Sequence, residues 1–152
     1  MSEEPVDPRM IFALFNEIGI IEQLSRAMFE ARLPKGVLVS HFSVLNHLIR
    51  VGDGRTPLEL ATAFQVPKTT LSHTLALLEK RGWIEMRPNP DDKRSKRVWI
   101  TDTGRAFREN AIGALEPDMA KLAHHPALQG TEDLVARLAE IRKYLDTARD
   151  PR

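Results

Sequence analysis

The feature that most constrains the fold is a change of hydrophobic period near the middle of the chain. Residues 83–87 and 97–101 are β-branched, aromatic or alternating in polarity, which is typical of strands. The segments on both sides instead repeat apolar residues every three or four positions, as helices do. Residues 88–96, between the two stretches, are rich in turn formers and charge. The sequence therefore predicts one β-hairpin with a long polar tip in an otherwise helical protein.

Capping signals bound the helices expected before the hairpin. Asp7, followed by a proline, suits the N-cap of a helix that runs to about residue 31. A second helix is expected at about residues 40–51, and Thr56-Pro57-Leu58-Glu59 opens a short third helix that ends near residue 64. A fourth is expected at about residues 67–81, because Gly82 suits the left-handed residue that closes a helix.

Helical periodicity returns after the hairpin. A helix is expected from about Asp102, with Thr101 or Asp102 as its N-cap, and Pro117 should kink or split it because proline lacks an N–H. A last helix begins after Gly130-Thr131. This order of elements predicts a mainly α protein with a small β-hairpin wing, a winged helix-turn-helix flanked by N- and C-terminal dimerisation helices.

The fourth helix has the two faces that a DNA-reading helix needs. Leu71, Leu75 and Leu78 form an apolar face that can dock on a scaffold, while the other face carries short polar or basic side chains. The same pattern also fits an ordinary amphipathic surface helix with capping threonines. The candidate DNA-binding residues on the polar face are Lys68, Thr69, Thr70, Ser72 and His73.

Positive charge is concentrated in and around the hairpin. Seven basic and three acidic side chains lie between residues 80 and 97, a net charge of +4, whereas the whole chain carries +1. Charge of this kind drives association with DNA through counterion release, and a projecting arginine can enter the minor groove. Charge runs are often only solvated turns, but a basic hairpin directly after a helix-turn-helix pattern favours DNA binding. The hairpin candidates are Arg87, Lys93, Arg94, Lys96 and Arg97.

These segments together resemble the MarR family of bacterial transcriptional regulators. The resemblance is carried by Leu58-Glu59-Leu60-Ala61, by the run from Leu77 to Ile84, by Pro90-Asp91-Asp92-Lys93-Arg94-Ser95, and by Ile100-Thr101-Asp102-Thr103-Gly104. It implies a repressor that binds double-stranded DNA at a palindromic operator and leaves it when a small aromatic or phenolic effector binds. It also implies that Arg94 enters the minor groove and that Asp92 orients it. His73 departs from the family, which often has arginine at this position.

The long N- and C-terminal helices could form the interface of a homodimer. Their apolar rows could equally pack within one subunit, but the winged core can bury its own apolar residues without them, and MarR-like proteins dimerise in this way. We therefore expect residues 1–36 and 102–152 to form the helical dimerisation region and residues 37–101 to form the DNA-binding region. The expected dimerisation residues are Ile11, Leu14, Phe15, Ile18, Leu134, Leu138, Ile141 and Leu145.

Other function classes have little support in the sequence. The chain has no cysteine, no secretion signal and no apolar run long enough to cross a bilayer, so we expect a cytoplasmic protein without disulfides. The five histidines show no metal-ligand spacing, and no phosphate loop, nucleophile elbow or paired carboxylates are present, so neither a metal, a cofactor nor an enzyme is expected. Trp83 and Trp99 are interpreted as core or cross-strand contacts rather than a ligand site. The alternative function is a winged-helix protein-interaction module with no specific DNA target.

Overall fold

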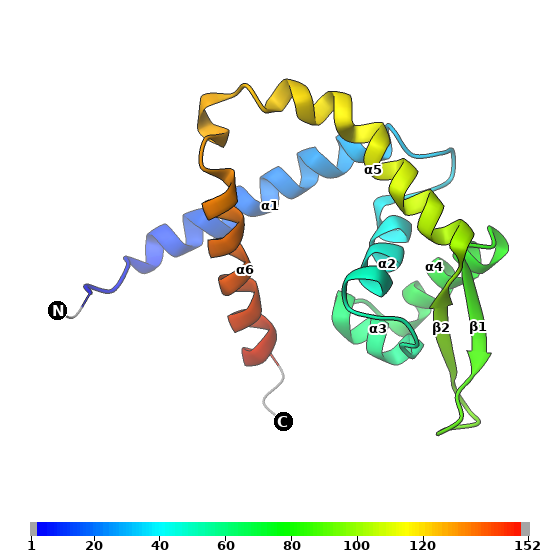
Figure 1. Ribbon diagram of the computed structural model, residues 1–152. Coiled ribbons are helices and arrows are strands. Elements are labelled where there is room, and N and C mark those ends of the chain that lie inside the picture. Colours follow the sequence, from blue (N-terminus) through cyan, green and yellow to red (C-terminus); the bar gives the residue numbers. More distant parts are fainter. Residues whose placement is uncertain (1–2, 150–152) are drawn as a thin grey trace. The chain divides into compact units, whose positions relative to one another are not determined.

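The computed structural model describes residues 3–149, and its elements follow the predicted order (Figure 1). The chain divides after Leu115 into two compact units. The helices are α1 (Pro8–Glu30), α2 (Val39–Arg50), α3 (Pro57–Phe64), α4 (Lys68–Lys80), α5 (Asp102–Leu122) and α6 (Thr131–Ala148), and the strands are β1 (Ile84–Pro88) and β2 (Lys96–Ile100). A short 3-10 helix, η1 (Pro126–Leu128), was not predicted. The fold class, mainly α with one antiparallel hairpin, is confirmed.

The predicted caps are in place at the helix ends. The Asp7 side chain accepts a hydrogen bond from the Arg9 amide (2.9 Å), and Thr56 Oγ1 accepts one from the Glu59 amide (3.2 Å). These side chains satisfy amide groups that the first turn of a helix leaves without a partner. Gly82 has φ +73°, the left-handed conformation that lets the chain leave α4 and enter β1.

The core of the first unit forms where α2, α3, α4 and the hairpin meet. The buried face of α2 is made by Val44, Leu45 and Leu48 with His41, while Phe42 and Ile49 are only partly buried. Helix α4 packs against α2, α3 and β1 through its predicted apolar residues. The buried apolar residues are Leu33, Val37, Val44, Leu45, Leu48, Leu60, Ala61, Leu71, Leu75, Leu78, Trp83, Ile84, Val98, Ile100 and Ala111.

The hairpin is joined to α5 through a tight contact at Gly104. Thr101 is the N-cap of α5: its hydroxyl donates to the Gly82 carbonyl (2.7 Å) and accepts from the Gly104 amide (3.0 Å). A side chain at position 104 would overlap the Trp83 carbonyl, so glycine is what allows this approach. Trp83 stacks on Phe107 with ring centroids 3.8 Å apart, which confirms its interpretation as a core residue. The Ile-Thr-x-x-Gly segment thus fixes the start of α5 against the hairpin.

Pro117 was predicted to kink or split its helix, and the split is wrong, because α5 continues through Pro117 to Leu122. Proline removes one intrahelical hydrogen bond, that from its own nitrogen to the carbonyl four residues earlier, which here belongs to Gly113. A helix of 21 residues can lose one such bond without ending. Pro117 does lie two residues after the boundary between the two compact units.

Polar contacts tie the end of α1 to the start of α2 in the first unit. Glu30 Oε1 accepts from the Val39 amide (3.1 Å), and the buried His41 Nδ1 accepts from the Leu38 amide (2.8 Å). Arg81, which follows α4, donates to the Lys35 carbonyl (3.1 Å). Burial lowers the pKa of His41 below its ordinary value of 6.5, Arg81 lowers it further, and Glu30 acts in the opposite direction.

The lowered pKa of His41 predicts a loss of stability in mild acid. Between the folded-state pKa and 6.5 the unfolded chain binds more protons than the folded chain, so the free energy of unfolding falls as the pH falls through this range. Burial also lowers the pKa of His47, with Arg50 and Arg55 acting in the same direction. We expect urea unfolding to give a lower free energy of unfolding at about pH 5.5 than at about pH 7.5. His41→Gln should reduce this difference, because glutamine at this position can still accept from the N-cap amide but does not titrate. An equal pH dependence in parent and variant would contradict the prediction.

The expected dimerisation residues are not covered within their own units. Neither α1 nor α6 has a buried residue. On α1, Ile11, Leu14, Phe15 and Ile18 are between 37% and 42% exposed. On α6, Leu134 and Leu145 are exposed, while Leu138 and Ile141 are partly buried. Both helices therefore carry apolar side chains that are not fully buried within their own units.

Candidate nucleic-acid interface

Helix α4 presents its five predicted DNA-binding residues to solvent. Its buried side is formed by Leu71, Thr74, Leu75 and Leu78, at the spacings of three and four that give a helix one apolar face. No acidic residue lies in its first turn. The residues exposed on its other side include all those predicted, which are Lys68, Thr69, Thr70, Ser72 and His73.

Two hydroxyl groups of α4 donate hydrogen bonds to backbone carbonyls of the same helix. Ser72 Oγ donates to the Lys68 carbonyl (2.9 Å), and Thr74 Oγ1 donates to the Thr70 carbonyl (3.2 Å). Ser72 therefore keeps lone pairs, but not its proton, for an outside partner. Thr69, Thr70 and His73 are exposed on the same helix.

The hairpin that follows is built on a regular antiparallel register. Ile84 pairs with Ile100, Met86 with Val98, and Pro88 with Lys96. A third backbone segment, which the sequence reading missed, extends the sheet: the Val98 amide donates to the Arg55 carbonyl (2.8 Å), and the Gly54 amide donates to the Val98 carbonyl (2.9 Å). Strand β2 is therefore held on both of its edges.

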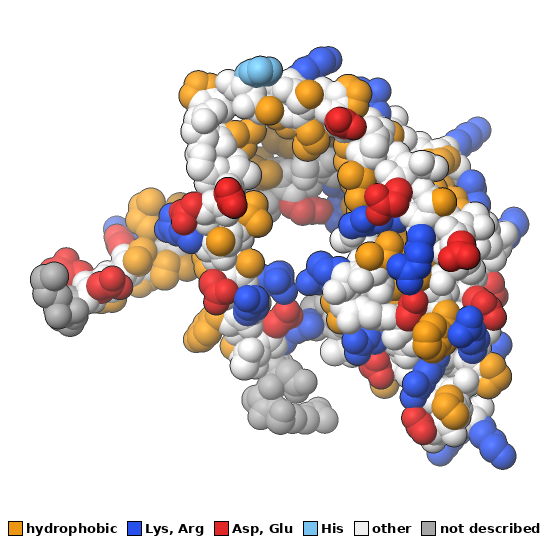
Figure 2. Space-filling view, in the orientation of Figure 1, with side chains coloured by type: hydrophobic (Ala, Val, Ile, Leu, Met, Phe, Trp, Pro, Cys, Tyr) orange, Lys and Arg blue, Asp and Glu red, His pale blue; other side chains and the backbone are white. Residues whose placement is uncertain are grey.

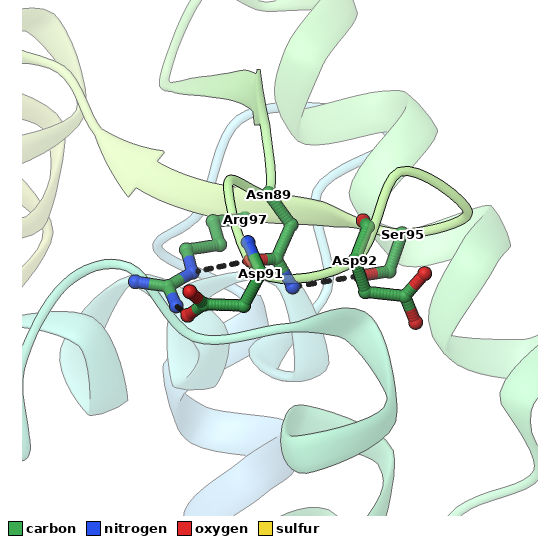
Figure 3. A network of polar contacts seen from close by, with 5 residues as sticks. All are labelled: Asn89, Asp91, Asp92, Ser95 and Arg97. Atoms are coloured by element: carbon green, nitrogen blue, oxygen red, sulfur yellow. Dashed lines mark hydrogen bonds and ion pairs between the residues drawn. The ribbon is translucent and has the colours of Figure 1, made fainter.

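The tip of the hairpin is organised around Asn89, which is buried although it lies in the polar turn. Its Oδ1 accepts from the Asp91 amide (3.0 Å) and from Arg97 Nε (3.2 Å), and its Nδ2 donates to Ser95 Oγ (2.9 Å). Figure 3 shows these side chains converging between the two strands. One amide side chain thus satisfies three partners, and the turn has a defined conformation rather than that of a loose loop.

Two of the five basic candidates are engaged within the hairpin. Arg97 forms an ion pair with Asp91 (2.7 Å), and Arg87 forms one with Glu85 (3.3 Å). The Arg87 guanidinium also lies over the Trp99 ring, 4.7 Å from its centroid. Both arginines contribute to the shape of the hairpin, and their charges are partly balanced by neighbouring acids.

The other three basic candidates, Lys93, Arg94 and Lys96, are exposed at the tip. The Arg94 side chain is 96% exposed. Asp92 Oδ1 accepts from the Arg94 amide (2.9 Å) and lies 3.8 Å from its Nε, so Asp92 is placed beside the arginine that it was predicted to orient. Figure 2 shows Lys and Arg side chains gathered around the hairpin at the lower right. The tip is an ordered turn that projects positive charge.

Asp53, which was not among the predicted residues, supports the hairpin from the turn before α3. Its Oδ1 accepts from the Ile100 amide (2.8 Å), and its Oδ2 accepts from Arg105 (3.2 Å). The carboxylate thereby links the turn before α3 to the end of β2 and the first turn of α5. Asn89 was likewise counted only as a turn former, although the Asn-Pro-Asp sequence was a signal for a side chain that binds its own turn.

Removal of the Asn89 side chain should loosen the tip selectively. We expect Asn89→Ala to cost this turn about 1–2 kcal/mol, which makes amide exchange at residues 91–95 roughly 5–30-fold faster while the helices keep their protection. Hydrogen exchange followed by NMR measures this, with Asn110→Ala, an exposed asparagine on α5, as the control. Unchanged exchange at the tip would show that Asn89 does not organise it.

The described residues contain neither a metal-binding cluster nor a membrane-spanning helix. No group of three or more His, Asp or Glu side chains in residues 3–149 has the geometry to hold a metal ion. No helix in this range is both long enough and apolar enough to cross a bilayer.

Comparison with known proteins agrees with this geometry. Residues 35–95 match the family model described as MarR family. Wild-type MarR from E. coli, in its apo form, is 28% identical, with 93% of this chain and 98% of that chain covered and a TM-score of 0.64. A mutant MarR from E. coli complexed with operator DNA is 26% identical, with 88% and 99% covered and a TM-score of 0.63. A MarR transcriptional regulator from Methanosarcina mazei Go1 shares the fold at 18% identity, with 88% and 96% covered and a TM-score of 0.72.

The exposed polar face of α4 and the basic hairpin define a winged helix-turn-helix protein of the DNA-binding type. Residues 35–95 match the MarR family model, and the chain is similar over most of its length to solved MarR structures, which supports a winged-helix regulator of this kind.

Proposed function

We propose that this protein is a homodimeric, sequence-specific DNA-binding regulator that places α4 in the major groove and the hairpin tip on the adjacent minor groove. The DNA-binding residues are the exposed set on α4 and the basic set of the hairpin, with Asp92 orienting Arg94. Residues 37–101 form the DNA-binding region, and residues 1–36 with 102–152 form the dimerisation region. In this proposal the protein works in the bacterial cytoplasm, where it meets chromosomal DNA.

The observation that carries this proposal is the ordered basic tip. Arg94 is held by its backbone contact to Asp92 and projects with 96% of its side chain exposed, beside the exposed Lys93 and Lys96. A cation presented on an ordered turn loses less conformational entropy on binding phosphate than one on a loose loop. The similarity to E. coli MarR, which has been solved in complex with operator DNA, supports the same use of this surface.

Dimerisation is supported by the apolar side chains of α1. Monomeric proteins rarely leave a continuous apolar stripe open to water, and association is the usual means of covering one. A twofold dimer would present two copies of the α4 and hairpin surface to half-sites about 34–36 Å apart, which predicts a palindromic operator. The exposed apolar residues of α1 include Met10, Ile11, Phe12, Leu14, Phe15, Ile18, Ile20, Ile21 and Leu24.

Control by a ligand rests on the family resemblance. We propose that the protein represses transcription and is released from DNA by a small aromatic or phenolic effector bound between the dimerisation helices and the winged region. Such an effector acts only through a difference in its affinity for the DNA-competent and DNA-incompetent conformations.

The proposal is tested by selection from a random pool of DNA duplexes, followed by a salt titration with the selected duplex. We expect a palindromic sequence to be enriched, and the logarithm of the affinity to fall steeply and linearly with the logarithm of the salt concentration. Sedimentation of the free protein should give the mass of a dimer. Absence of an enriched sequence, with weak binding to every duplex, would favour a protein-interaction module instead.

A further inference from the structure

Helix α2 begins at a residue whose side chain cannot cap it. The N-cap is Leu38, an apolar residue without an acceptor. Two other side chains bind the amides there: the His41 ring accepts from the Leu38 amide (2.8 Å), and the Glu30 carboxylate, at the end of α1, accepts from the Val39 amide (3.1 Å). Amides at the start of a helix have no partner within the helix, so both contacts stabilise α2. We call this group of contacts the α1–α2 joint.

The histidine contact exists only while Nδ1 of His41 carries no proton. A neutral imidazole accepts through one nitrogen, whereas a protonated ring donates through both. Protonation would therefore set two N–H groups against each other across 2.8 Å. It would also place a positive charge at the N-terminus of α2, which the helix dipole disfavours. His41 is only 7% exposed, so the ring must leave the amide before water can solvate its charge.

Charged groups from two neighbouring elements act on the His41 ring. Arg81, which follows α4, repels a protonated ring and donates to the Lys35 carbonyl (3.1 Å) in the turn before α2. Glu30 attracts a protonated ring. The first turn of α2 itself has no acidic residue. The attraction therefore draws on the same carboxylate that accepts from the Val39 amide, so a charge on His41 disturbs both contacts of the joint.

We propose that the α1–α2 joint is an acid-sensitive switch, in which protonation of His41 releases the Leu38 amide, loosens the start of α2 from the end of α1 and lowers the affinity for DNA. The effect on DNA rests on the proposed function, because the separation of two recognition surfaces then depends on how α1 is joined to α2. Phe29 and Phe42 also join these helices, with ring centroids 4.6 Å apart, and neither titrates. The joint can therefore loosen while α1 stays attached.

Hydrogen exchange at the Leu38 and Val39 amides measures the switch directly. If only the loosened joint takes up the proton, with the ordinary pKa of 6.5, a change from about pH 7.5 to about pH 5.5 shifts the equilibrium toward it by about 10-fold. After correction for the intrinsic pH dependence of exchange, we expect protection of these amides to fall by up to about 10-fold in the parent and less than about 2-fold in His41→Gln.

Glu30→Gln gives a second, independent reading. Glutamine at this position can still accept from the Val39 amide, but it carries no charge to attract a protonated His41. We expect the fall in protection to move to lower pH in this variant, because Glu30 acts to raise the pKa of His41. His124→Gln is the matched control: it removes an exposed histidine in the second unit and should leave the pH dependence at the joint unchanged.

Affinity for the selected duplex, at one fixed salt concentration and the same two pH values, tests the link to DNA. We expect acid to weaken binding by the parent by about 3-fold or more relative to its effect on His41→Gln. The exposed His73 acts in the opposite direction, since a charge gained on α4 favours phosphate. His73 is present in both proteins, so its contribution cancels in this comparison.

Two results would overturn the inference. One is equal protection of the Leu38 amide at both pH values in the parent, which needs no variant to be measured. The other is an affinity for DNA with the same pH dependence in the parent and in His41→Gln. In either case a duplex selected at about pH 7.5 would still support the proposed function. Failure to select any duplex would remove the proposed function, while exchange at the joint would still decide whether acid loosens it.

Discussion

Arg94→Ala is expected to weaken binding to the selected duplex by about 1–3 kcal/mol, roughly 5–150-fold, which is the range for one groove contact. The fold should not change, because the side chain is 96% exposed and its ion pair with Asp92, at 3.8 Å, is a surface pair of little energetic value. Fluorescence anisotropy at one fixed salt concentration measures the affinity, and sedimentation should show that the variant keeps the oligomeric state of the parent.

Two further variants separate groove contact from simple loss of charge. Lys121→Ala removes one positive charge from the last turn of α5, in the second compact unit and outside the proposed DNA-binding set, and should change the affinity only slightly. Arg94→Lys keeps the charge but loses the planar guanidinium, so it should recover only part of the affinity. If Arg94→Ala binds as tightly as the parent protein, the wing does not contact DNA through this residue.

Gly104→Ala is expected to lower the free energy of unfolding by about 3 kcal/mol or more, at the upper end of the cost of overpacking. The added methyl group would overlap the Trp83 carbonyl and lie 3.0 Å from Ile100 Cγ1. Trp83 has little room to move away, because its carbonyl accepts from the Thr101 amide (3.1 Å) and its ring is stacked on Phe107. Chemical denaturation followed by circular dichroism measures the change.

Gly113→Ala is the matched control, since it makes the same substitution in the same helix. Nothing lies within 4 Å of a methyl group at position 113. Alanine there should be neutral or stabilise the protein by up to about 1 kcal/mol, because glycine loses more backbone entropy in a helix. Equal effects at the two positions would mean that the contact with Trp83 does not decide the result at Gly104.

The elements with local signals could be predicted from the sequence. Asp7, Thr56 and Gly82 marked helix ends, and the structure has the predicted caps and the left-handed glycine at these positions. The change of period located the hairpin, whose strands begin and end within one residue of the predicted limits. These features depend on interactions between residues close in sequence, which are the interactions that a single chain displays most directly.

Features that depend on distant residues could not be predicted. Arg87, Arg94 and Arg97 are alike in sequence, but only the register of the hairpin shows that Arg87 and Arg97 are cross-strand partners, while Arg94 lies outside the paired strands. The pairing of Arg55 with Val98 joins segments 43 residues apart and has no local signal. The assignments of DNA-binding and dimerisation residues stay predictions, since they concern partners outside the single chain.

The close approach at Gly104 also has a mechanical consequence. With no side chain between the first turn of α5 and the Trp83 backbone, and with Thr101 bonded to both, the hairpin and this end of the helix cannot slide past each other. A rotation of the first turn of α5 is therefore expected to move the hairpin with it. A displacement of this end of α5 would accordingly be passed on to the basic tip of the hairpin.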